Sequence, residues 1–184
     1  MIGQHNLLNA LAVIAAADRI GIDRQVISKA LETFEGIKRR QELRGVKNGI
    51  SVMDDFAHHP TAVRETVAAV RSAHPEKRLI AVFEPRTNSS MRDIFQQDYV
   101  QVFDPADLVC VRQPPLLKKI PEGQRFSSRQ LTDDLKQRGK DAHFFPDTDS
   151  IIDFLLTQTR YGDLVLIMSN GGFDNIHQRL LDVL

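Results

Sequence analysis

Polar side chains stand at four places where an apolar run ends. These stretches are Met53-Asp54-Asp55, Phe83-Glu84-Pro85-Arg86, Val111-Arg112 and Met168-Ser169-Asn170. If the apolar runs are parallel strands, their carboxyl ends meet at one edge of the sheet, where ligands of such folds bind. A carboxylate there suits the hydroxyls of a ribose, and an arginine can hold a carboxylate or phosphate through two parallel N–H bonds.

Two histidines, His58 and His59, follow Asp55 directly before Pro60. They could titrate, ligate a metal or position a phosphate. As a metal site the pair is weak, because adjacent side chains point apart and no third ligand stands nearby. We therefore predict no metal site made by this chain alone. For Asp55, the alternative to ligand binding is a favourable interaction with the dipole of the following helix.

Two asparagines, Asn6 and Asn9, stand three residues apart near the start of a helical pattern, and so on one face of it. Two amides there could pair with the edge of a heterocycle such as adenine. The alternative is that Asn6 caps the helix and Asn9 is solvated. Arg39 and Arg40 stand in a loop, where arginine can hold a phosphate, although a solvated basic turn explains them equally well.

The last apolar run ends in Ser169-Asn170-Gly171-Gly172-Phe173. Paired glycines let the backbone approach a ligand, although a tight turn also needs them. After Arg86, either Asn88 or Ser89 could cap a helix. The sequence contains no Gly-x-x-x-x-Gly-Lys-Ser/Thr loop and no Gly-x-Gly-x-x-Gly, so a phosphate site here would be only half of a site.

Alternating strand and helix patterns position these residues. Two helices are expected first, at 6–20 (ended by Gly21) and 23–34 (capped by Asp23 and stopped by Gly36), and then a hairpin over 42–54 with an Asn-Gly turn. Helices are expected at 60–73, 89–98, 128–138, 149–160 and 174–183, with strands at 78–83, 107–111, 142–145 and 163–168. This order predicts an α/β fold, with a mostly parallel sheet and helices on both faces. The two-helix segment lies outside that pattern, so we place a domain boundary near residues 36–41.

Composition excludes several classes of protein. The 184 residues carry 24 Lys and Arg against 24 Asp and Glu, which argues against a dedicated nucleic-acid or membrane-surface binder. The single cysteine, Cys110, excludes an internal disulfide and fits a reducing compartment. No apolar stretch reaches the roughly 18–20 residues of a membrane span. We expect a cytoplasmic domain that binds neither membrane nor nucleic acid.

The motifs, in this order, resemble those of the Mur ligase family, the ATP-dependent amide ligases of peptidoglycan assembly. They are Gly3-x-His5-Asn6-x-x-Asn9, Phe34-x-Gly36 with Arg39-Arg40-x-Glu42, and the run from Asp54 to Pro60, followed by a Rossmann-like tail. The resemblance covers essentially the whole chain. It implies that residues 1–36 are the last helices of the family's central ATPase domain and residues 37–184 its C-terminal Rossmann-like, acceptor-binding domain. The chain would then be part of a longer enzyme, and inactive alone.

The resemblance also implies roles for individual residues. His5, Asn6 and Asn9 would border adenine, Asp55 would hold the ribose, and Arg40 would face the terminal phosphates of ATP. His58 would lie near the reacting centre. The acceptor pocket would be lined by Arg86, Asn88, Ser169 and Asn170.

The run from Asp54 to Pro60 indicates the branch of the family that acts on UDP-N-acetylmuramate. Glu84-Pro85-Arg86-Thr87-Asn88 and the final glycine turn favour the tripeptide L-alanyl-γ-D-glutamyl-meso-diaminopimelate as acceptor. In the implied reaction, which needs ATP and Mg²⁺, the muramate carboxylate attacks the γ-phosphate, and the tripeptide amine then displaces phosphate from the acyl phosphate. The alternatives are a ligase that adds L-alanine and a binding module without catalysis.

Overall fold

A six-stranded sheet with strand order β1-β2-β6-β3-β4-β5 forms the centre of the fold. The computed structural model describes residues 2–184. Only β1 is antiparallel to its neighbour, β2; the other strands pair in parallel, which confirms the expected mostly parallel α/β sheet. The strands are β1 (Glu42–Lys47), β2 (Ile50–Asp55), β3 (Leu79–Phe83), β4 (Leu108–Arg112), β5 (Asp141–Phe145) and β6 (Leu164–Met168).

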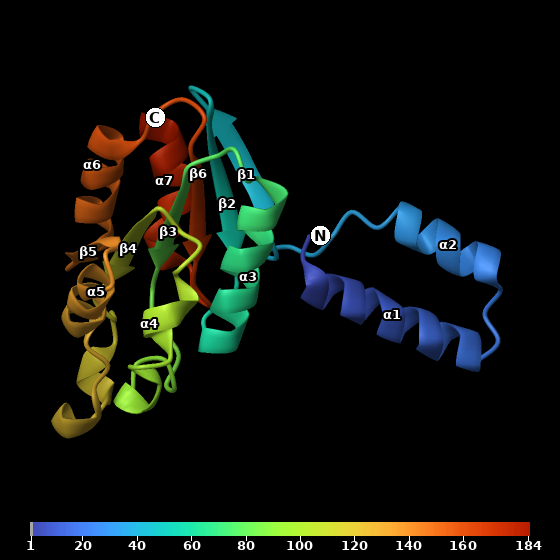
Figure 1. The fold of residues 1–184 in the computed structure, drawn as a ribbon, viewed down its shortest axis with the longest axis horizontal. Helices are drawn as coiled ribbons and strands as arrows, with labels where there is room; N and C mark the ends of the chain where they lie inside the picture. The colour runs from blue at the N-terminus through green and yellow to red at the C-terminus, as the bar shows by residue number, and fades with distance from the viewer. Residues whose placement is uncertain (1) are drawn as a thin grey trace.

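Helices cover both faces of the sheet (Figure 1). On one face pack α3 (Pro60–Ala73), α4 (Tyr99–Val102) and α5 (Ser128–Gln137); on the other pack α6 (Thr148–Gln158) and α7 (Ile176–Val183). Within β3, Phe83 and Ala81 join the first core, while Val82 and Ile80 join the second. Because both of their faces are buried, the central strands β3 and β6 are apolar throughout rather than alternating.

The first two helices, α1 (Gln4–Arg19) and α2 (Arg24–Glu32), project away from the sheet (Figure 1). Their attachment is local: the amide of Ile2 donates to Gln41 Oε1 at 2.8 Å, and Gly3 lies against Ala69 of α3. A Cβ on Gly3 would come within 2.5 Å of Ala69 Cβ, and Gly3 has φ +99°, so this approach requires glycine. None of the helices in residues 2–184 is both long and apolar enough to cross a membrane.

The helix predicted at 89–98 is wrong. A short 3-10 turn at Asp93–Phe95 stands there, and α4 begins only at Tyr99. Arg92 instead has an extended backbone, with φ −99° and ψ 155°, and forms a β-bridge with Arg125, which interrupts the helical pattern. Neither Asn88 nor Ser89 therefore caps a helix.

The predicted cap by Asn6 is also wrong, and two other helix ends differ from expectation. Helix α1 starts at Gln4 after Gly3, and the side-chain Nδ2 of Asn6 instead donates to Ile2 O at 2.8 Å. Asp23 does cap α2, which ends at Glu32, before Gly36, because Thr33 becomes its C-cap. Helix α7 starts at Ile176 rather than at 174, after a 3-10 turn at Phe173–Asn175.

Candidate functional site

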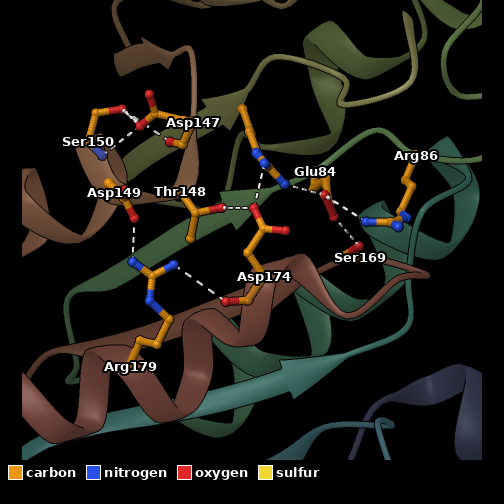
Figure 2. A network of polar contacts seen from close by, with 10 residues as sticks. Glu84, Arg86, Asp147, Thr148, Asp149, Ser150, Ser169, Asp174 and Arg179 are labelled. Carbon is orange, nitrogen blue, oxygen red and sulfur yellow. Dashed lines mark hydrogen bonds and ion pairs between the residues drawn. The ribbon is translucent and has the colours of Figure 1, made fainter.

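The polar strand ends do converge at one edge of the sheet (Figure 2). Glu84, just past β3, is fully buried, and its carboxylate binds Arg112 Nη1 at 2.7 Å and the Ser169 hydroxyl at 2.9 Å. Arg86 Nη1 lies farther from the same carboxylate, at 3.6 Å. The side chains that follow β3, β4 and β6 therefore form one connected cluster.

Arg112 is held between two carboxylates. Its Nη2 atom lies 2.5 Å from Asp174 Oδ2, which also accepts from the Thr148 hydroxyl at 2.8 Å. Asp174 is the middle of three consecutive left-handed residues, from Phe173 to Asn175, with φ values of 47°, 49° and 57°. Such backbone strain clusters at ligand-binding and catalytic sites. The carboxylates of Glu84 and Asp174 together balance the positive charge of Arg112.

Arg86 is the arginine of this cluster that remains able to bind an anion. Its side chain is 33% exposed, and the one carboxylate near it is already bound more closely by Arg112. It packs against Gly171, where an added Cβ would lie 2.3 Å from Arg86 Cδ. The missing side chain of Gly171 therefore makes room for Arg86.

The turn that follows β6 presents further polar groups. The amide of Gly171 donates to Ser169 Oγ at 2.9 Å, which closes the turn. Asn170 Oδ1 is buried and accepts no hydrogen bond from the residues of the described chain. Asn88 is not part of this cluster: it is exposed, and its Oδ1 accepts from Arg92 Nε at 3.3 Å.

A cavity of about 890 Å³ lies mainly between α1 and α2, and it extends along the segment after α2 to Asp55 at the end of β2 and Thr66 of α3. Five residues predicted to bind the nucleotide line it, namely His5, Asn6, Asn9, Arg40 and Asp55. Apolar side chains of both helices, including Val13, Val26 and Ile27, complete the wall. The structure thus brings these five residues together from segments up to fifty residues apart. His58, Arg86, Asn88, Ser169 and Asn170 do not line it.

Asp55 joins the cavity to the sheet. It is buried; Oδ2 accepts from the amide of Gln41 at 2.9 Å, and Oδ1 accepts from the amide of Ala57 at 2.7 Å and the Thr66 hydroxyl at 3.4 Å. Burial raises the pKa of Asp55, and the amides of Ala57 and Gln41 oppose that shift only in part. The carboxylate fixes the loops on either side and still has lone pairs for one more donor.

Arg39 and Arg40, the two arginines of the basic loop, contact different parts of the site. Arg40 lines the cavity, with its guanidinium 5.4 Å from the centre of the Phe56 ring. Arg39 instead donates to the backbone oxygens of Ser169 and Gly171 at 2.6 and 2.7 Å, and to Asp54 at 3.2 Å. Residue type alone does not distinguish the two, although the family resemblance assigns the terminal phosphates to Arg40.

His177 and Asp54 form a second buried pair, which the sequence analysis did not predict. His177 Nε2 in α7 lies 3.2 Å from Asp54 Oδ1, and both side chains are buried. Burial favours the neutral form of Asp54, but the interactions with His177 and Arg39 outweigh it and lower the pKa of Asp54. The neighbouring aspartates therefore differ: the pKa of Asp54 is lowered by its charged partners, whereas burial raises the pKa of Asp55 beside the cavity.

His58 lies in the loop between β2 and α3, half-buried. Its Nδ1 atom is 2.9 Å from Phe56 O, and because a carbonyl only accepts, Nδ1 carries the proton. The Nε2 atom of the neutral ring then presents a lone pair. Within residues 2–184, no group of three or more His, Cys, Asp or Glu side chains is placed to hold a metal ion.

Comparison with known proteins identifies similar proteins over nearly the whole chain. Residues 39–171 match the model of the "Mur ligase, glutamate ligase domain" family. The UDP-N-acetylmuramate–L-alanyl-γ-D-glutamyl-meso-2,6-diaminoheptanedioate ligase of Escherichia coli K12 is 40% identical over 99% of this chain. The UDP-N-acetylmuramate–L-alanine ligase of Caldanaerobacter subterraneus is 35% identical over 98% of it.

A solved structure shares the fold. The crystal structure of a murein peptide ligase from Psychrobacter arcticus matches 99% of this chain with a TM-score of 0.76 and 38% identity. The chain spans only 37% of that protein, and 38% of each of the two curated relatives.

Proposed function

This chain belongs to the Mur ligase family, and we propose that it is the C-terminal part of an ATP-dependent ligase that joins UDP-N-acetylmuramate to a murein tripeptide. Residues 1–36 would be the last helices of the central ATPase domain, and residues 37–184 the acceptor domain. The observation that carries the proposal is the cavity shared by His5, Asn6, Asn9, Arg40 and Asp55. Most of its lining comes from the first proposed domain, and a few residues of the second complete it, namely Ile37, Arg40, Gln41, Asp55 and Thr66.

The cavity has the chemistry that an adenine nucleotide needs. Amides of Asn6 and Asn9 can pair with the edge of a base, and the apolar side chains of the helices can cover its faces. His5 Nδ1 and Gln41 Nε2 are buried polar atoms without hydrogen-bond partners in the described chain, as expected where a ligand completes the bonding. Asp55 can accept from a ribose hydroxyl, and Arg40 can neutralise phosphate charge.

The sheet edge supports an anionic acceptor. Arg86 has guanidinium N–H groups to spare, and Asn170 Oδ1 is an acceptor that needs a donor. A peptide end that carries a carboxylate and an amino group supplies both complements. The diaminopimelate end of the tripeptide L-alanyl-γ-D-glutamyl-meso-diaminopimelate carries both groups, and its amine stays free because the alanyl amine at the other end is the one that reacts. Free L-alanine has a single amine, which is the reacting group itself.

The chain would contribute positioning and charge neutralisation to ligation. Arg40 would stabilise the negative charge that develops on the transferred phosphoryl group, as arginine does in phosphoryl transfer. His58 could accept a proton at Nε2 near the attacking amine, which must be neutral to react. Mg²⁺ would be held mainly by the nucleotide phosphates and the remainder of the longer protein, since this ion needs few protein ligands. The product would be an amide, with ADP and phosphate, made in the cytoplasm from recycled cell-wall peptide.

Ligation of L-alanine is the second candidate, because an L-alanine ligase and a tripeptide ligase both stand among the relatives at similar identity. Competition decides between them: the longer protein is given UDP-N-acetylmuramate, ATP, L-alanine and the tripeptide together, and the products are separated by mass. We expect the tripeptide adduct to predominate. Mainly alanyl product would favour the second candidate.

A binding experiment tests the nucleotide site in this chain alone. Isothermal titration with ADP should show binding, while ligation by this chain alone should be undetectable, because the proposed remainder of the enzyme is missing. Absence of ADP binding would contradict the nucleotide site, and ADP formation that depends on the tripeptide would contradict the partial-enzyme proposal.

A further inference from the structure

Arg39 connects two parts of the candidate site that are far apart in sequence. Its Nη2 atom donates to Ser169 O at 2.6 Å and to Gly171 O at 2.7 Å, across about 130 residues of chain. Its Nε atom binds the buried Asp54 carboxylate at 3.2 Å. One guanidinium therefore fastens the turn after β6 to the segment that precedes β1.

The backbone around Arg39 is fixed in an uncommon conformation. Arg39 has φ +58° and Gln41 has φ +51°, values that non-glycine residues rarely adopt. The Arg39 amide donates to Glu42 Oε2 at 2.7 Å, and its carbonyl accepts from the amide of Phe56 at 2.8 Å. This backbone lets the side chain of Arg39 reach the turn, while Arg40 and Gln41 line the cavity.

Contacts continue from Arg39 to the candidate acceptor arginine. Gly171, whose carbonyl Arg39 holds, is the residue against which Arg86 packs. The path Arg39–Gly171–Arg86 therefore runs from the loop at the nucleotide cavity to the anion-binding side chain. Nothing else in residues 2–184 donates a side-chain hydrogen bond to the Gly171 carbonyl.

We infer that Arg39 is a positioning residue, which holds the Ser169–Gly171 turn and thereby Arg86 in a fixed place relative to the nucleotide cavity. The positioning itself follows from the contacts, whereas its consequence for ligation rests on the proposed function. Lysine cannot replace Arg39, because a single ammonium group cannot reach two carbonyls and a carboxylate with the geometry of the planar fork. A one-ångström displacement of a reacting group is enough to impair catalysis strongly.

The first test needs no ligand. Amide hydrogen exchange is measured by NMR in this chain for Arg39→Lys, with Arg44→Lys as the matched control. Arg44 also lies beside Asp54, at 3.9 Å, but makes no contact with the turn. We expect the Gly171 amide to exchange about tenfold faster or more in Arg39→Lys, with Val165 in the sheet core unchanged, because a local opening raises exchange only where it occurs.

Unchanged exchange at Gly171 would overturn the inference, as would an equal change in Arg44→Lys. If Arg39→Lys unfolds the chain, Arg39→Gln replaces it, since its neutral amide can still donate to one carbonyl. Cooperative melting of each variant shows that it is folded.

The second test measures the consequence in the longer protein. For Arg39→Lys we expect the KM for the acceptor to rise about tenfold or more, as for the loss of bonds to a charged group, with the KM for ATP little changed. Arg44→Lys should behave like the unmodified enzyme. A normal acceptor KM beside fast Gly171 exchange would overturn the role in ligation. If the unmodified protein ligates no acceptor, the proposed function fails, and the exchange result still decides whether Arg39 positions the turn.

Discussion

Arg112 Nη1 lies 2.7 Å from Glu84 Oε2, and both side chains are buried at the ends of neighbouring strands. This pair leaves Arg86, 3.6 Å from the same oxygen, without a closer charged partner among residues 2–184. A buried structural pair thus lies next to Arg86, the side chain that we propose to bind the acceptor. The two arginines can be tested separately.

Arg112→Met should destabilise the chain strongly, because it leaves the buried Glu84 carboxylate without its close cation. We expect the free energy of unfolding to fall by roughly 3 kcal/mol, as for other broken buried pairs. Denaturation in guanidinium chloride measures it. The control is Arg138→Met, which breaks the exposed pair with Asp104 and should cost less than about 1 kcal/mol. Equal losses would show that burial of the Glu84 pair has no special importance.

Arg86→Lys should impair the acceptor step. Lysine keeps the charge but loses the fork that binds a carboxylate through two bonds, so kcat/KM for the tripeptide should fall steeply while kinetics for ATP change little. Steady-state kinetics and a melting curve are recorded on the same variant of the longer protein. A lower melting temperature with normal tripeptide kinetics would mean that Arg86 only holds its loop through Glu84.

Gly171→Ala should displace Arg86 without unfolding the chain. The new Cβ would meet Arg86 Cδ at 2.3 Å, so the arginine must move. Gly172→Ala is the matched control, because its Cβ would meet nothing within 4 Å and its φ of −74° suits alanine. We expect a raised acceptor KM for Gly171→Ala alone. The same KM in both variants would argue against a role for the packing of Arg86 on Gly171.

Asp55→Ala should weaken nucleotide binding. A hydrogen bond from a ribose hydroxyl to a carboxylate is charge-assisted, and its loss should cost about 1.5–3 kcal/mol of ADP binding. Calorimetric titration of this chain measures the change. Thr132→Val is the control, since it removes a buried hydroxyl that donates to Arg129 O and does not line the cavity, and it should bind ADP nearly normally. Unchanged affinity in Asp55→Ala would leave Asp55 as a residue that only fixes the loops.

Asp54 should contribute to stability above its ordinary pKa of 3.8. Because the folded-state pKa is lowered, this contribution is complete above the unfolded value and is lost as the pH falls from 3.8 through the folded pKa. Asp54→Asn should therefore show a smaller acid-side fall in the free energy of unfolding. His177→Gln should raise the pKa of Asp54, as followed by NMR of the carboxyl carbon. The same acid-side fall in Asp54→Asn would contradict the assignment.

Most of the fold was predictable from residue patterns. Short apolar runs without alternation, such as Leu164–Met168, are typical of strands buried on both faces when helical patterns flank them, and this predicted the sheet and its helices. The same argument predicted that the polar side chains at the strand ends meet at one edge, because parallel strands end on the same side. These side chains are Glu84, Arg112 and Ser169. The helix expected at 89–98 does not form because Arg92 pairs with Arg125 as an extended β-bridge, a contact between distant segments that residue patterning does not detect.

The contacts that distinguish adjacent, chemically similar residues could not be predicted from residue type. Arg39 and Arg40 have the same side chain, yet one binds backbone carbonyls at the sheet edge and the other lines a cavity. Asp54 and Asp55 likewise have pKa values shifted in opposite directions, since one faces His177 and Arg39 while burial dominates the other. Charge and hydrogen bonding act through distances between segments far apart in the chain, and those distances exist only in the folded protein.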